Sequence, residues 1–147
     1  MWLSNDTTPT QSFTGYISNF RLINGSAIYT STFTVPTAKL TAISQTVALM
    51  CQSNRFVDNS NNAYSITVNG DTSVKPFSPF APTSDYAANT VGTSLYFDGS
   101  GDYLTVASNT NFAIASGDDY TVEAWVNYNG NAAGAFFQTD TNISSTT

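Results

Sequence analysis

The sequence predicts an all-β protein, folded as an antiparallel sandwich. Only 10% of its 147 residues are charged and 14% are aromatic, so rings can build the core while Asn, Ser and Thr keep the surface polar. Short stretches with apolar residues at every second position are separated by Asn-Gly and Asp-Gly pairs, which is typical of strands joined by tight turns. No stretch of the sequence has the periodicity of an amphipathic helix.

The first strong strand candidate is Phe13–Ile23. Both of its faces carry apolar residues, so we expect burial on both sides. Arg21 is unusual in such a strand, and the favoured interpretation is a structural cation that pairs with a carboxylate or with backbone carbonyls, rather than a ligand-binding group. The next stretch, Ala27–Phe33, is expected to be short and extended before Val35-Pro36 blocks further pairing.

The middle of the chain predicts two more strands and a strap. Thr46–Ser53 alternates, and Val47, Leu49 and Cys51 fall on its apolar side. Cys51 is therefore expected to be a small buried hydrophobe, because a nucleophilic thiol would need a base such as His. Ala63–Val68 is the next strand, after a polar loop, and the proline-rich Val74–Pro82 is expected to run extended across the surface.

The stretch Ser94–Val106 predicts a β-hairpin. Its two arms alternate apolar and polar residues, and the connection contains two glycines between Asp98 and Asp102. Aspartates beside glycines in a tight bend favour a turn-forming role, and a calcium ion held by their carboxylates is the alternative. The apolar side of the hairpin, expected in the core, is formed by Leu95, Phe97, Leu104 and Val106.

Tyr120–Tyr128 is the clearest strand of the sequence, after a loop with one helical turn expected at Asn111–Ala115. Glu123 and Trp125 lie on its outer face. A Trp beside a carboxylate can stack on and hydrogen-bond a sugar, so these two residues are the ligand-binding candidates, although such a Trp is more often covered by a loop or a second sheet. The opposite face, expected in the core, holds Tyr120, Val122, Ala124, Val126 and Tyr128.

Composition excludes several classes of protein. The net charge of −6 and the presence of only four basic residues argue against nucleic-acid binding. With no His and one Cys, the chain can form neither an internal disulfide nor a zinc site of Cys and His. No apolar run is long enough for a membrane span, and the residues Met1–Gln11 do not have the pattern of a secretion signal.

Several segments resemble a known superfamily. SLYFDGSGDYLTV, followed by DDYTVEAWVNY, resembles the opening strands of the laminin-G-like, concanavalin A-like modules, and FTGYISNFRLINGSAIYTSTFTVP resembles their closing strand. The bridge LMCQSNRFVDNSNNAYSITVNG, continued by PFSPF, is similar to the start of each module in tandem repeats of marine bacteriophage (cyanophage) structural proteins. The resemblance implies a concanavalin A-like jelly-roll β-sandwich.

The order of these segments predicts the domain organisation. Closing-strand motifs precede opening-strand motifs, so residues 1–45 are expected to close one module and residues 46–147 to open the next, with a boundary near Thr41–Thr46. The alternative is one permuted sandwich over residues 1–147. The resemblance implies about a dozen strands and the pattern supplies roughly seven, so open sheet edges are expected, to be covered by neighbouring copies or by the rest of a longer chain.

The chemistry of the sequence predicts a protein that is not an enzyme and has no cofactor. Retaining glycosidases of this superfamily place two carboxyl groups about 5 Å apart, whereas Asp119, the nearest carboxylate on the face of Glu123, lies four residues away, or roughly 13 Å along a strand. Without His the acid–base inventory is small.

Two function classes follow from the resemblance. The first is a non-enzymatic virion structural protein, as a capsid decoration, tail or fibre component, whose partners are other copies of itself or other virion proteins. The second is a carbohydrate-binding adhesion module on a cell or virus surface, whose partners are host surface glycans. Both imply a virion or extracellular location, without nucleic-acid binding or membrane insertion.

Overall fold

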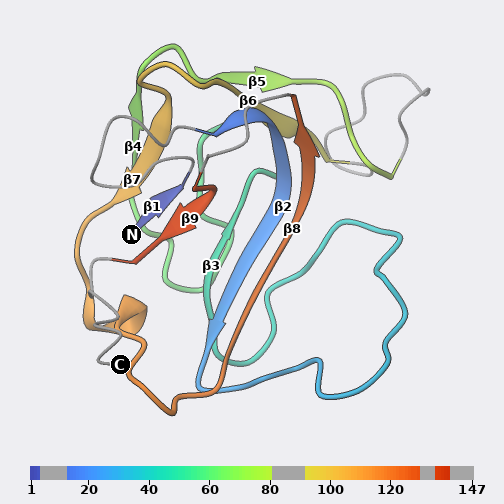
Figure 1. The fold of residues 1–147 in the computed structure, drawn as a ribbon, viewed down its shortest axis with the longest axis vertical. Coiled ribbons are helices and arrows are strands. Elements are labelled where there is room, and N and C mark those ends of the chain that lie inside the picture. The colour runs from blue at the N-terminus through green and yellow to red at the C-terminus, as the bar shows by residue number, and fades with distance from the viewer. Residues whose placement is uncertain (4–12, 81–91, 130–134, 140–147) are drawn as a thin grey trace.

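The computed structural model describes residues 1–3, 13–80, 92–129 and 135–139. The described residues form two antiparallel β-sheets and one short 3-10 turn, Thr110–Phe112, so the all-β prediction is confirmed (Figure 1). The strands are β1 (Trp2–Leu3), β2 (Thr14–Asn24), β3 (Thr46–Met50), β4 (Ile66–Asn69), β5 (Ser73–Lys75), β6 (Ser94–Asp98), β7 (Tyr103–Val106), β8 (Tyr120–Tyr128) and β9 (Phe137–Gln138).

The larger sheet is built around β2. One side of β2 pairs with β6 through residues 14–17 and with β3 through residues 20–23, and β5 continues the sheet beyond β6. The other side pairs with β8 along nearly its whole length. A bulge between Ser18 and Arg21 interrupts this ladder, and Asn19 adopts a left-handed conformation there, with a φ of 52°. The smaller sheet has the order β4-β7-β1-β9.

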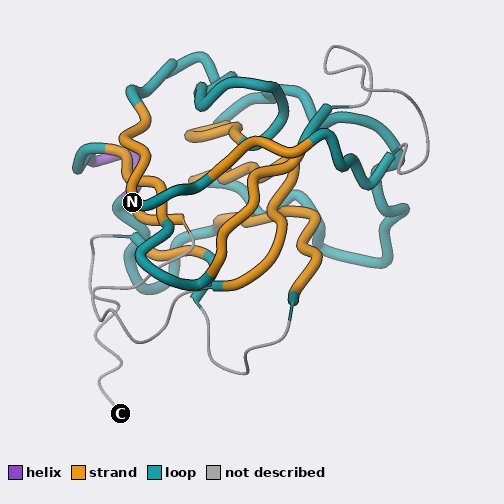
Figure 2. Tube along the Cα trace, turned by 90° about the horizontal axis from the view of Figure 1, so that it is seen from above, coloured by secondary structure: helices purple, strands orange, loops and turns teal. Residues whose placement is uncertain are grey.

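The core lies between the two sheets, whose strands curve round a common interior when the molecule is seen from above (Figure 2). Side chains from β2, β3 and β6 meet side chains from β1 and β7 there. The alternation of the sequence predicted the buried faces of β6 and β7, because period-two patterns fix which face of a strand is buried. The largest fully buried hydrophobic side chains are Phe20, Phe97, Met1, Leu3, Ile17, Leu22, Ile23, Leu49, Met50, Leu95 and Leu104.

The predicted hairpin at Ser94–Val106 is wrong, although the sides of its two arms are right. β6 belongs to the larger sheet and β7 to the smaller, so the chain crosses between sheets at the loop that contains Gly99 and Gly101. The carboxylate of Asp102 accepts the backbone N–H groups of Asp98 and Asp71, which ties this corner together. An alternating pattern cannot distinguish a hairpin from such a corner, because both bury the same faces.

The expected core face of β8 is correct only in part. Val122 and Ala124 are partly buried against the core, but Tyr120, Val126 and Tyr128 are 46%, 43% and 46% exposed. The reason is position in the sheet. β8 pairs with β2 alone among the described strands, and toward its ends the described part of the smaller sheet does not cover it.

Of the remaining elements expected from the sequence, some agree with the structure and others do not. The stretch Ala27–Phe33, expected to be short and extended, is a loop that joins neither sheet, whereas the helical turn expected near Asn111–Ala115 is the 3-10 turn. Cys51 is buried as predicted, and burial raises the pKa of its thiol far above the usual range. The predicted strap begins as strand β5 against β6, and residues 81 and 82 lie outside the described part.

Strands from both predicted modules share the same two sheets. β2, from the range 1–45, lies between β8 on one side and β3 and β6 on the other, all from the range 46–147. Likewise, β1 pairs with β7 and β9. The division of the chain into two modules and the jelly-roll order of a concanavalin A-like fold remain predictions.

Candidate functional site

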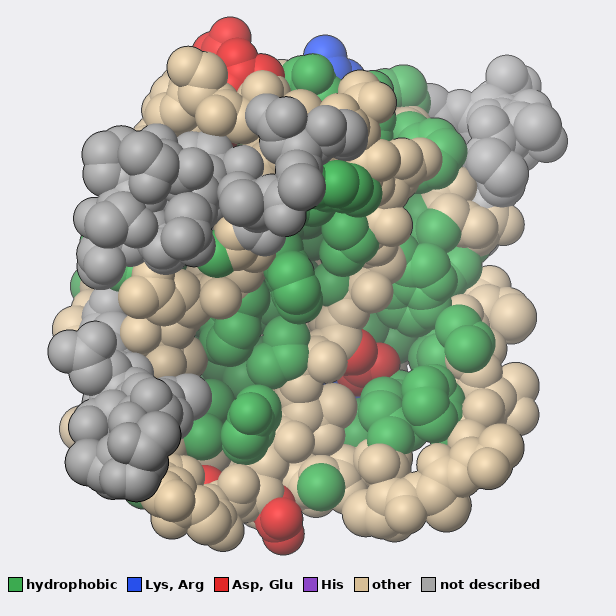
Figure 3. Space-filling view, viewed as in Figure 1, with side chains coloured by type: hydrophobic (Ala, Val, Ile, Leu, Met, Phe, Trp, Pro, Cys, Tyr) green, Lys and Arg blue, Asp and Glu red, His purple; other side chains and the backbone are tan. Residues whose placement is uncertain are grey.

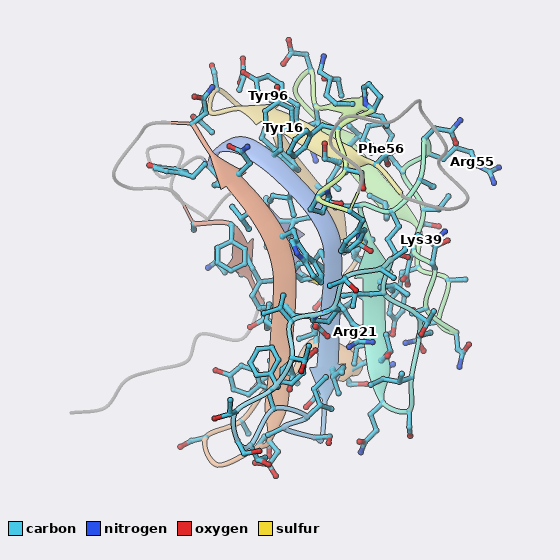
Figure 4. The ribbon with its side chains drawn as sticks, turned by 90° about the vertical axis from the view of Figure 1, so that its right-hand side faces the viewer. Tyr16, Arg21, Lys39, Arg55, Phe56 and Tyr96 are labelled. Carbon is cyan, nitrogen blue, oxygen red and sulfur yellow. The ribbon has the colours of Figure 1, made fainter. Side chains whose placement is uncertain are left out.

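Glu123 occupies the middle of β8, directly opposite Arg21 of β2. The Arg21 Nε atom donates to Glu123 Oε1 at 2.5 Å, and Nη2 contacts the same oxygen. Nη1 donates to the backbone carbonyl of Thr41 at 2.8 Å. Both side chains are largely buried, with 7% and 11% exposure for Arg21 and Glu123. Arg21 therefore pairs with a carboxylate and caps a carbonyl, as the sequence predicted (Figure 4).

The second carboxylate oxygen of Glu123 is also engaged. The Tyr29 hydroxyl donates to Oε2 at 2.7 Å, and this contact joins the long loop after β2 to the outer face of the sheet. Partial burial and the neighbouring Glu123 carboxylate together raise the pKa of Tyr29 above its ordinary value. Because both oxygens of Glu123 have partners within the chain, its contacts are those of a structural group that fastens the loop to β8.

Trp125 lies next to Glu123 on the same face of β8, and its ring packs edge-on against Phe80 at a centroid distance of 5.0 Å. Two hollows meet at this Trp. The first, here called the Tyr16 hollow, has a volume of about 370 Å³ and is lined by Tyr16, Ser18, Phe77, Pro79, Ser94, Trp125, Val126, Asn127 and Tyr128. The second, here called the Tyr29 groove, has a volume of about 480 Å³ and is lined by Tyr29, Phe33, Val35, Pro36, Val122, Glu123, Ala124, Trp125, Val126 and Phe136.

The Tyr16 hollow combines rings with hydroxyl groups. The rings of Tyr16 and Tyr96 lie 5.0 Å apart at the upper end of the sheet, and Phe77 packs against Tyr16 at 5.6 Å (Figure 4). The Ser94 Oγ atom is buried at the wall of the hollow, and no described residue supplies it with a hydrogen-bond partner. The accessible part of the hollow is therefore its rings, and rings of this kind form a surface on which a sugar can stack.

The structure brings the two predicted ligand-binding residues together but gives them different surroundings. Glu123 and Trp125 both line the Tyr29 groove, and Trp125 alone of the two lines the Tyr16 hollow. The sequence did not predict Tyr16 and Ser94 as site residues. The hollow is assembled from three separate parts of the chain, which are β2, the segment that leads from β5 into β6, and β8, and no local pattern brings them together. The run of Phe and Pro after β5 was interpreted as a segment lying across the surface. It forms one wall of the hollow, and its composition was the feature of the sequence that pointed there.

A cluster of three carboxylates marks the corner between the sheets. Ligand atoms of Asp71, Asp98 and Asp102 lie within 4.8 Å of one another. Asp102 accepts from the N–H of Asp71 at 2.7 Å and of Asp98 at 2.9 Å, and Asp98 accepts from the N–H of Ser100 at 2.6 Å. Burial, followed by the like charges of the two neighbouring aspartates, raises the pKa of Asp102, although the two N–H groups oppose the shift.

The contacts of this cluster fit the predicted turn-forming role of Asp98 and Asp102. Asp71, which the sequence reasoning did not single out, joins them because Gly70 brings its backbone against the corner. Gly70 has a φ of +69°, and a Cβ placed on it would lie 2.3 Å from Asp102 Oδ1. Calcium binding at Asp98 and Asp102 remains a prediction.

Comparisons of the chain with protein-family models, with curated proteins and with solved structures found no match. Among the described residues, no helix has the length and apolar character needed to cross a membrane. The functional interpretation therefore depends on the geometry of the chain itself and on the resemblance described from its sequence motifs.

Proposed function

We propose that this chain is a non-enzymatic structural module of a virion, a capsid decoration, tail or fibre component, that works by assembling with other copies of itself or with other virion proteins. The observation that carries the proposal is the exposed apolar surface along β8. The resemblance of the sequence motifs to bacteriophage structural proteins supports a place in a virion, and the exposed surface supports assembly as the way the chain works.

This surface, here called the β8 side, is formed by β8 together with the segments beside it that line the Tyr29 groove. Figure 3 shows a band of hydrophobic side chains down the middle of the face that holds β8 and β9. Soluble monomers rarely leave contiguous apolar surface of this kind uncovered, so a partner polypeptide is its natural cover. Its most exposed large hydrophobic members are Phe33 (50%), Val35 (58%), Tyr120 (46%), Val126 (43%), Tyr128 (46%) and Phe136 (39%).

The surroundings of Glu123 support a role without catalysis. Both oxygens of its carboxylate already accept hydrogen bonds within the chain, one from the Arg21 guanidinium and the other from the Tyr29 hydroxyl, so neither is free to contact a substrate. The chain has no His to replace it. Binding and assembly then remain as the functions that its surfaces can perform.

The test of the proposal is the presence of the chain in virus particles. Particles produced by the virus that encodes the chain are banded by density, treated with protease-free salt washes, and analysed by mass spectrometry and by labelling with antibody to the purified chain. We expect a fixed copy number per particle and antibody label on the particle surface, tail or fibre. A chain that is abundant in the infected cell but missing from banded particles would contradict the proposal.

Carbohydrate binding is the second candidate function, and the Tyr16 hollow favours it. The rings of Trp125 and Tyr16 line it, and aromatic rings are the side chains on which sugars stack. A glycan array probed with the purified chain tests this function. We expect specific binding to be lost in Trp125→Ala and Tyr16→Ala but kept in Tyr120→Ala, a matched aromatic truncation on the opposite face of β8. Binding that survives the first two changes would exclude the hollow as the site.

A further inference from the structure

The backbone N–H and C=O groups of β8 point alternately toward β2 and toward the opposite edge of the strand. The N–H of Asn129 donates to Thr14 and the carbonyl of Asp119 accepts from Gly25, so the odd-numbered residues of this stretch direct their backbone groups toward β2. Backbone groups alternate in direction along a strand, so the even-numbered residues direct theirs to the opposite side. The described part of the chain places no strand on that side. An unpaired edge of this kind is a template for another strand.

The same even-numbered residues form the apolar row of β8. Tyr120, Val122, Ala124, Val126 and Tyr128 therefore combine backbone groups that face the open edge with side chains that extend the core face. Any strand that paired here would gain hydrogen bonds and apolar contacts from the same five residues.

The sequence of β8 is close to a palindrome centred on Ala124. In YTVEAWVNY, Tyr120 mirrors Tyr128 and Val122 mirrors Val126, and on the other face Thr121 mirrors Asn127. An antiparallel pair of two identical strands is related by a two-fold axis, so each residue meets its mirror residue. Centred on Ala124, such a pair would place tyrosine opposite tyrosine, valine opposite valine and alanine opposite alanine along the apolar row.

We propose that two copies of this chain pair through β8, antiparallel and centred on Ala124, so that their larger sheets become one continuous sheet across a two-fold axis. The pairing rests on the proposed assembly function and names its first partner, a second copy. In this register Trp125 of each copy stands opposite Glu123 of the other. Each Trp125 is then positioned over the Tyr29 groove of the neighbouring copy, whose walls include the exposed Phe33 and Val35.

The charges along this edge are compatible with a second copy. The carboxylate of Glu123 is already neutralised by Arg21, so the two copies do not bring unpaired like charges together at the centre. Asp119 falls opposite Asn129 in the proposed register, not opposite its own copy. Lys39 and Arg55 lie on the β3 side of the sheet, away from β8 (Figure 4). The centre of this edge has no strong negative patch that would attract a basic partner. A neutral strand that is complementary to β8, such as β8 of a second copy, fits the charge of this edge better.

The remaining net charge of each copy predicts how pairing responds to salt. Two chains of net charge −6 repel each other at long range, and salt screens that repulsion over a Debye length of about 10 Å at 0.1 M. The self-association constant should therefore rise between 20 mM and 300 mM salt. Pairing with a basic partner would show the opposite trend.

The decisive experiment is sedimentation equilibrium of the whole chain over a wide concentration range, with two variants at the centre of β8. We expect a reversible two-copy species for the wild type. Ala124→Pro should be a folded monomer, because the N–H that proline removes points to the open edge and edge strands tolerate proline there. Circular dichroism and thermal unfolding of the variant confirm its fold.

A cysteine placed on the axis provides a second readout that does not require loss of pairing. In Ala124→Cys the two Cα atoms would lie about 5.5 Å apart, within the range that a disulfide spans, so oxidation should link the copies. Val126→Cys is the matched control on the same face. Its two copies would be separated by four residues along the strand, roughly 13 Å, and should not link. Cys51 is buried and common to both variants.

The outcomes separate the pairing from the function on which it rests. A monomer at all concentrations, a dimer that Ala124→Pro leaves intact, or equal cross-linking of the two cysteine variants would each overturn the pairing. If the chain is nevertheless found in banded virus particles, the assembly function stands and uses another contact. A β8 dimer that is absent from particles would support the pairing and contradict the virion role.

Discussion

Removal of the Glu123 carboxylate tests whether this residue is structural or a ligand-binding group. In Glu123→Ala, Arg21 keeps its contact with the Thr41 carbonyl but loses the carboxylate, and the Tyr29 hydroxyl loses its acceptor. Breaking a buried ion pair by deleting one partner costs about 3–5 kcal/mol. Because some water reaches both side chains, at 7% and 11% exposure, we expect a loss near the lower end, about 3 kcal/mol.

The measurement is urea unfolding followed by tryptophan fluorescence, supported by thermal unfolding at one fixed protein concentration. For a chain of this length about 3 kcal/mol corresponds to a fall in Tm of roughly 6–12 °C. Arg21→Met combined with Glu123→Met should recover most of the loss, because it removes both charges and keeps the volume. Spectrophotometric titration should also show the pKa of Tyr29 falling toward its ordinary value in Glu123→Ala.

A loss of less than about 1 kcal/mol in Glu123→Ala would refute the reasoning, because it would place the pair among exposed ion pairs. So would a double variant that is no more stable than the single one. Full stability together with lost glycan binding would return Glu123 to the role of ligand-binding residue that the sequence first suggested.

Three further changes probe the core, the strand pairing and the corner. Phe97→Ala should cost about 3–5 kcal/mol in urea unfolding because Phe97 is fully buried, and a cost below 1 kcal/mol would contradict the core assignment. Gly15→Ala should cost at least about 1–3 kcal/mol and lower the exchange protection of β8, because Gly15 has a φ of +146° and a Cβ would lie 2.2 Å from the Asn127 carbonyl oxygen. Asp102 has a raised pKa, so the wild type should lose stability relative to Asp102→Asn as pH rises from the ordinary value of 3.8 through the folded pKa, and parallel pH curves for the two proteins would contradict that shift.

The sequence was sufficient where structure depends on local alternation. The pattern of Tyr120–Tyr128 gave the bounds of β8 correctly, and the lone Arg21 in an apolar strand indicated a buried pair before its partner was known. The partner itself, Glu123, lies 102 positions away, and no local pattern encodes that distance. Long-range assignment also failed at β6 and β7, since burial on one face does not say which sheet a strand joins.

The candidate site was harder to predict because its parts come from separate segments. Trp125 was found from its strand, but Tyr16 and Ser94 reach the same hollow only after β2 has paired with both β6 and β8. The exposure of Val126 was missed for a related reason. Parity fixes the face on which a side chain lies, but the presence of a covering layer depends on the whole sheet order.

The edge of β3 shows how this protein covers an open strand, and a change there gives the last prediction. Asp58 accepts the N–H groups of Leu49, Ser60 and Tyr64 at 2.9–3.0 Å, and the N–H of Asn59 donates to the Leu49 carbonyl. The polar loop after β3 thus lies where a further strand would pair, whereas the described residues give β8 no such cover.

Asp58→Ala leaves three N–H groups without their acceptor, and each unpaired group costs about 1–3 kcal/mol when buried. We therefore expect the free energy of unfolding to fall by at least about 3 kcal/mol and hydrogen exchange at Leu49 to become faster. Asp58→Asn keeps one acceptor oxygen and should lose less. Unchanged exchange at Leu49 in Asp58→Ala would mean that the loop does not protect this edge, and the contrast between a covered β3 and an open β8 would lose its basis.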